Sequence, residues 1–133
     1  MKVLFDIREF SQYPNSSLVT KRSRVTKNRD EVRRFVRAWT EAIAFMKRRP
    51  QETQAILRKY VRLEDPEIIR GTYEFYTEKL PRSPKVLEKD FTSVMRSMKV
   101  YSPHTKSIGY EQVFDMTFVE EMERDDFIQS LYR

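Results

Sequence analysis

The densest group of chemically active side chains in the sequence is basic. It lies between residues 21 and 37 and comprises Lys21, Arg22, Arg24, Lys27, Arg29, Arg33, Arg34 and Arg37. Cations at this density can contact phosphates, which would give salt-sensitive binding to nucleic acid. Asp30, Glu31 and Glu41 dilute the charge, however, and no aromatic side chain lies between Lys21 and Arg29 to stack on bases. We therefore interpret the segment as a solvated helix face and do not expect nucleic acid as a partner. The alternative is a small helical module that binds nucleic acid or a partner protein through residues 21–37.

An acidic stretch near the other end of the chain is a weaker candidate for a metal site. It holds Glu120, Glu121, Glu123, Asp125 and Asp126. A calcium loop needs alternating oxygen ligands and a glycine, which this stretch lacks, so its spacing is typical of a solvated helix face. The only histidine, His104, is expected in a loop without a role, and the chain has no cysteine. We predict no metal site, no cofactor and no catalytic residue, because no nucleophile–base pair can be assembled, and hence no enzyme.

Composition narrows the function classes further. The 133 residues include 26 Lys and Arg against 20 Asp and Glu, which gives a net charge of +6. The chain has two glycines, Gly71 and Gly109, that stand far apart. Dinucleotide fingerprints and phosphate-binding loops need clustered glycines, so both are excluded. No apolar run approaches the roughly 18 residues of a membrane span, and the first six residues, MKVLFD, do not read as a signal peptide.

The elements that must position these side chains are mainly helical. Residues 3–7 and 18–20 favour short strands, separated by turn-forming residues at 13–17. Apolar residues at three- and four-residue steps predict a long helix that begins at Asn28, with Glu31 completing a capping-box pair. Proline and capping signals predict three further helices after Pro50, Asp65 and Ser83 and a last helix from Asp115 toward Leu131. The aromatic group Tyr73, Phe75 and Tyr76 is expected in the core.

These elements predict a single domain over residues 1–133 with an α/β, mainly helical fold. It has about five helices and two or three short strands. The strands and turn occupy residues 1–25 and the helical region residues 28–133.

Several segments resemble a known family. Residues 28–45 read NRDEVRRFVRAWTEAIAF, followed by Pro50 and by AILRKY at 55–60. Tyr13-Pro14, Ser16-Ser17-Leu18, Asp65-Pro66-Glu67 and the DMTFV of residues 115–119 match in the same order. Together they resemble the C-terminal part of substrate-binding proteins of ABC importers, of the sulfonate/nitrate/thiamine-precursor type.

The resemblance implies a type II periplasmic-binding fold, in which two α/β lobes close around a small solute that passes to an ABC permease. It implies a periplasmic or extracellular location, with a cytoplasmic one as the alternative because the first residues do not read as an export signal. Family members are longer, so we expect this chain to correspond to a truncated domain that begins within the second lobe.

The resemblance also places the turn at residues 13–17 toward the ligand cleft. Its hydroxyls and backbone N–H groups would suit a small organic anion or polar head group, and the candidate ligand-binding residues are Tyr13, Asn15, Ser16 and Ser17. A plain turn is the other interpretation. We expect one lobe alone to bind solute weakly, and its uncovered apolar faces to favour a homo-oligomer.

Overall fold

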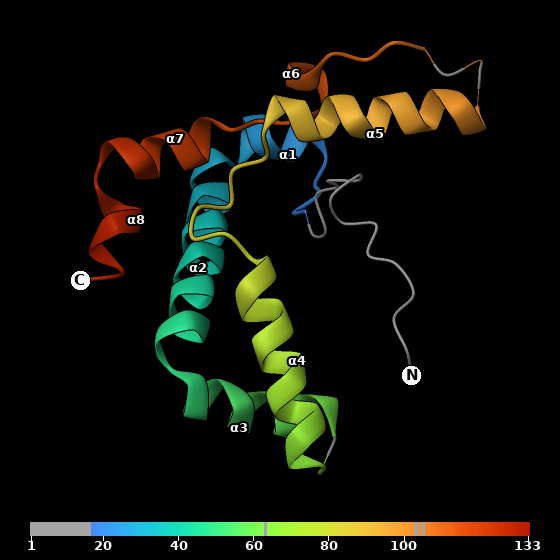
Figure 1. The fold of residues 1–133 in the computed structure, drawn as a ribbon. Coiled ribbons are helices and arrows are strands. Elements are labelled where there is room, and N and C mark those ends of the chain that lie inside the picture. Colours follow the sequence, from blue (N-terminus) through green and yellow to red (C-terminus); the bar gives the residue numbers. More distant parts are fainter. Residues whose placement is uncertain (1–16, 63, 103, 105) are drawn as a thin grey trace. The chain divides into compact units, whose positions relative to one another are not determined.

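The computed structural model describes residues 17–62, 64–102, 104 and 106–133 (Figure 1). This part of the chain contains eight helices: α1 (Arg22–Lys27), α2 (Arg29–Arg48), α3 (Pro50–Val61), α4 (Pro66–Lys79), α5 (Glu88–Tyr101), α6 (Tyr110–Val113), α7 (Thr117–Arg124) and α8 (Phe127–Ser130). The helices form two compact units. One comprises residues 22–85 and 117–133, and the other contains residues 86–116 and the described residues before Arg22.

The α/β prediction is wrong, because no strand occurs among the residues that the structure describes. The predicted strand at residues 18–20 is irregular and exposed, with Val19 at 90% exposure. Three β-favouring residues do not make a strand without a partner to pair with, since β propensity mostly reflects packing against neighbours. The other predicted strand, residues 3–7, lies outside the described residues.

The larger unit is organised around α2. This helix contacts α1, α3 and α7, while α3 packs on α4 and α7 on α8 (Figure 1). Thr40, Ile43 and Ala44 of α2 are buried, because positions three and four apart share one helix face. The buried residues of the other helices are Thr53, Ile69, Phe118, Val119, Met122 and Ile128. The core of this unit therefore combines residues 40–69 with residues 118–128.

Local signals set the starts of α3 and α4. Pro50 occupies the first turn of α3, and the Asp65 carboxylate accepts hydrogen bonds from the backbone N–H groups of Glu67 and Ile68 at the start of α4. The predicted capping pair at α2 is wrong. The Asn28 side chain makes no capping bond, and Glu31 instead pairs with Arg24 at 2.6 Å.

Two other features of this unit differ from the sequence expectations. Phe75 and Tyr76 are 51% and 52% exposed, so the core placement of these aromatics is wrong for both. The predicted single C-terminal helix is broken between α7 and α8, where Asp126 adopts a left-handed backbone with φ of 56°. The break allows α8 to turn and bury Ile128 against the rest of the unit.

The smaller unit contains α5 and α6. Phe91 is its buried aromatic residue and meets the rings of Tyr110 and Phe114 edge-on, with ring centroids 6.1 and 5.8 Å away. The Tyr110 hydroxyl donates to the Val86 carbonyl at 2.5 Å, which ties α6 to the segment before α5.

Candidate functional site

The turn predicted to bind ligand lies almost entirely outside the described residues. Of its four candidate residues, Tyr13, Asn15 and Ser16 are not described, and Ser17 is exposed in an irregular segment ahead of α1. Ser17 is accessible to a ligand, and the ligand-binding role of the turn stays a prediction.

The basic segment 21–37 is described in full, and two of its arginines converge on one carboxylate. The Arg29 guanidinium donates to Glu121 Oε1 at 3.2 Å and to the Thr117 hydroxyl at 2.8 Å. Arg33 Nε donates to Glu121 Oε2 at 2.9 Å. The hydrogen bonds from Arg33 and Arg29 hold the pKa of Glu121 below its usual value, and those to Glu121 raise the pKa of Arg33. This cluster fastens the N-terminal half of α2 to α7.

Two arginines of the basic segment also contact aromatic rings. The Arg29 guanidinium carbon lies 4.3 Å from the centre of the Phe118 ring, and that of Arg37 lies 3.7 Å from the centre of the Phe127 ring. Such cation–π contacts orient the guanidinium and cover apolar surface. Arg29 is held by Glu121 and Thr117 as well as by its ring, which favours a structural role for this arginine. Arg37 has the ring contact and no ion pair to a carboxylate among the described residues.

A shallow, open depression lies where α1 meets α2. Its lining mixes cations with carboxylates: Thr26, Lys27, Asn28, Arg29, Asp30, Glu31 and Arg34. Small-molecule sites normally enclose most of the ligand surface. Because the depression is open and its lining carries both signs of charge, it lacks the enclosure and the single charge that would select an anion.

Glutamates of the acidic stretch form tertiary contacts that stabilise the fold. Glu123 accepts hydrogen bonds from Lys85 at 2.9 Å and from the Ser83 hydroxyl at 3.0 Å, and the bond from Lys85 lowers the pKa of Glu123. His104 is exposed. No group of His, Cys, Asp and Glu in the described part of the chain could hold a metal ion.

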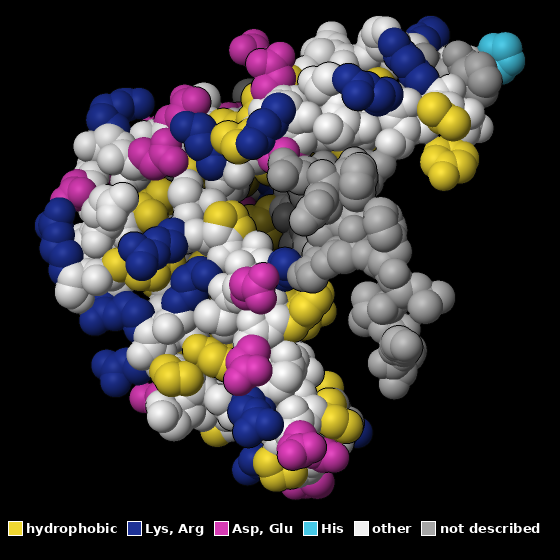
Figure 2. All heavy atoms as spheres, in the orientation of Figure 1, with side chains coloured by type: hydrophobic (Ala, Val, Ile, Leu, Met, Phe, Trp, Pro, Cys, Tyr) yellow, Lys and Arg dark blue, Asp and Glu magenta, His cyan; other side chains and the backbone are white. Residues whose placement is uncertain are grey.

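Exposed apolar side chains occur on several helices of the larger unit. On α2 they include Phe35, Trp39 and Phe45, at 60%, 37% and 43% exposure, and α3 adds Ile56, Tyr60 and Val61. Figure 2 shows apolar side chains scattered over the visible face of α3 and α4. The homo-oligomer stays a prediction. None of the described helices has the length and apolarity required to cross a bilayer.

Comparison with known proteins gives one match. A family model described as NMT1/THI5 like matches residues 2–53, which include the candidate turn, α1 and α2. The match confirms, for this region, the resemblance to substrate-binding proteins of the sulfonate/nitrate/thiamine-precursor type. Searches among curated proteins and among solved structures found no match.

Proposed function

We propose that this chain is the substrate-binding component, or a truncated relative of that component, of an ABC-type importer for a small organic anion or related solute. The family match over residues 2–53 is the observation that carries the proposal. The matched region includes all four candidate residues of the turn. The net charge of +6 also supports it, because a positive surface raises the local concentration of anions.

In the proposed mechanism, the turn donates hydrogen bonds to the solute. The hydroxyls of Tyr13, Ser16 and Ser17 and the Asn15 amide are donors suited to oxyanions. In a binding protein with two lobes, closure of the cleft excludes water and strengthens such polar contacts. The role is one of binding and delivery to a permease at the outer face of a membrane, and it requires no catalysis.

The proposal is tested by NMR-detected titration of the full chain with methanesulfonate, nitrate and an aminopyrimidine. We expect saturable shifts at the turn for at least one of these probes, with a dissociation constant of about 1 mM or weaker, because one lobe supplies only part of the contacts. The combined Asn15→Ala and Ser16→Ala variant should lose the shifts.

A matched serine substitution serves as the control. Ser130 is exposed, and its hydroxyl donates only to the Phe127 carbonyl in its own helix, so Ser130→Ala should bind like the unaltered chain. The proposal fails if no probe gives saturable shifts, or if the turn variant binds as well as the control.

The structure gives the alternative function, binding of nucleic acid through residues 21–37, less support. Arg29 and Arg33 already share Glu121. Nucleic-acid binding would therefore depend mainly on side chains outside these contacts, such as Lys21, Lys27 and Arg34.

A further inference from the structure

Two cations of the larger unit, Lys47 near the C-terminal end of α2 and Arg82 after α4, have no ion pair to a carboxylate among the described residues. Lys47 Nζ donates to the carbonyl oxygen of Thr77 at 2.5 Å, which fixes the ammonium at the end of α4. Arg82 follows α4, and its guanidinium carbon lies 4.6 Å from the centre of the Tyr132 ring. We call Lys47, Arg82 and Tyr132 the Lys47 cluster.

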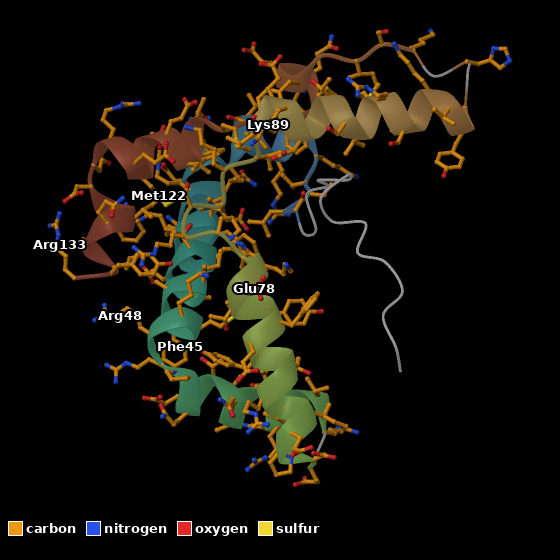
Figure 3. The ribbon with its side chains drawn as sticks, in the orientation of Figure 1. Phe45, Arg48, Glu78, Lys89, Met122 and Arg133 are labelled. Carbon is orange, nitrogen blue, oxygen red and sulfur yellow. The ribbon has the colours of Figure 1, made fainter. Side chains whose placement is uncertain are left out.

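The C-terminal end of the chain is held close to the same end of α2. Arg48 Nη1 donates to the Leu131 carbonyl at 2.6 Å, and these two residues directly follow and precede members of the cluster (Figure 3). Figure 2 shows Lys and Arg side chains over this side of the unit with few acidic ones among them.

Neither cation of the cluster forms an ion pair within the described part of the chain. Glu78, which follows Thr77, pairs with Lys79 at 3.1 Å, and Asp126 pairs with Arg133, which follows Tyr132. Glu123 accepts from Ser83, the residue after Arg82, and pairs with Lys85 at 2.9 Å. Burial and the positive charge of Arg82 lower the pKa of Lys47. Two like charges held close together are unfavourable unless an anion lies between them.

The Tyr132 hydroxyl adds an unsatisfied donor. Its oxygen is buried and has no hydrogen-bond partner among the described residues. Burial raises the pKa of this hydroxyl although Arg82 opposes the shift, so it remains protonated and can donate at neutral pH. A buried polar group without a partner costs free energy, which a bound acceptor would recover.

We propose that the Lys47 cluster binds a small oxyanion such as inorganic phosphate or sulfate. The N–H groups of a guanidinium lie in one plane and suit two oxygens of such an anion, and Arg82 has no ion pair to a described carboxylate that would occupy them. Lys47 keeps further ammonium protons beyond the one given to Thr77, and Tyr132 supplies its hydroxyl. The site does not rest on the proposed transport function, because none of its residues lies in the matched turn.

The test is a titration of the full chain with sodium phosphate and with sodium sulfate at constant ionic strength. Binding is measured by NMR and by thermal unfolding. Saturable shifts at Lys47 and Tyr132 and a rise in the unfolding midpoint are expected. Arg82→Gln should raise the apparent dissociation constant about tenfold or more, the range for loss of a charge-assisted hydrogen bond.

Two further variants make the result specific. Tyr132→Phe keeps the ring beneath Arg82 and removes only the hydroxyl, so it should weaken binding without disturbing the fold. Arg58→Gln removes the same charge from an exposed position on α3 and should leave binding unchanged.

Several results would overturn the site. Sulfate and phosphate also stabilise proteins generally by exclusion from the surface, so equal stabilisation of all the variants would mean a salt effect alone. Chloride acting as well as phosphate would exclude selection of an oxyanion, and undiminished binding by Tyr132→Phe would exclude the hydroxyl. Loss of binding in the turn variant, with Arg82→Gln unaffected, would place the anion in the transport site instead.

Discussion

Two buried threonines of the larger unit should respond in opposite directions to the same substitution. Thr53 on α3 is 8% exposed, and its hydroxyl has no hydrogen-bond partner in the described part of the chain. Thr40 on α2 is fully buried, but its hydroxyl donates to the Val36 carbonyl at 2.9 Å. Replacing either residue by valine exchanges a hydroxyl for a methyl group at nearly constant volume. Threonine and valine also have similar helix propensities.

The magnitudes follow from the cost of an unpaired polar group. Burying a hydroxyl without a partner costs about 1–3 kcal/mol, so Thr53→Val should raise the free energy of unfolding by about 1–2 kcal/mol. Thr40→Val removes a hydrogen bond whose net contribution is about 0.5–1.5 kcal/mol, so it should lower that free energy by this amount. The two variants should therefore differ by about 1.5–3.5 kcal/mol, the sum of these opposite changes.

Urea and thermal unfolding followed by circular dichroism would measure both changes. For a chain of this size, about 1 kcal/mol shifts the thermal midpoint by roughly 3–6 °C. A fall in stability for Thr53→Val, or an equal rise for both variants, would refute the reasoning. A fall in stability for Thr53→Val would mean that the Thr53 hydroxyl has a hydrogen-bond partner in solution.

Three further predictions concern a helix cap, acid stability and the basic segment. Asp65→Ala removes the acceptor for the N–H groups of Glu67 and Ile68 and should cost about 1 kcal/mol in a urea titration, whereas Asp65→Asn should cost little. Stability of the unaltered chain should fall as the pH drops below about 4.5, because the pKa values of Glu121 and Glu123 are lower in the folded chain than the ordinary 4.5 and the unfolded chain binds protons first. The urea midpoint of the double variant Glu121→Gln and Glu123→Gln should change less over this range, and an equal fall in both proteins would contradict this origin. Retention on heparin should be weak and should decrease more for Lys27→Gln than for Arg33→Gln, because Arg33 is held by Glu121, and the opposite order would contradict this explanation. Strong retention that is lost at moderate salt would favour nucleic-acid binding.

The sequence predicted the features that depend on neighbouring residues. Pro50 and the Asp65-Pro66 pair set the starts of α3 and α4 because capping and the fixed φ of proline act within one helical turn. Apolar spacing predicted the helix α2 for the same reason, whereas the residues that the fold buries on it are Thr40, Ile43 and Ala44. The short helix α1 was missed, since its six residues bury none of their side chains and so leave no apolar periodicity to detect.

Features that depend on distant residues could not be predicted this way. The contacts of Glu121 with Arg29 and Arg33 join positions about ninety residues apart, and nothing in the local spacing of either segment indicates the other. The strand expected at residues 18–20 failed for a related reason, because a strand requires a pairing partner that local propensity does not supply. For the candidate site, the sequence singled out the turn, but it gave no signal for Lys47, Arg82 and Tyr132, which come from three separate segments.

Whether a basic residue points to a ligand depends on whether the fold also brings a carboxylate to it. Arg33 belongs to the densest basic run in the sequence, yet it lies 2.9 Å from Glu121 and has little charge left to offer a partner. Arg82 stands apart from that run, between two prolines, and the fold places it on Tyr132 without an ion pair to any described carboxylate. An anion would gain more at Arg82, since binding there need not break an existing ion pair. Unpaired cations are therefore a better guide to a binding site in this chain than the local density of lysine and arginine.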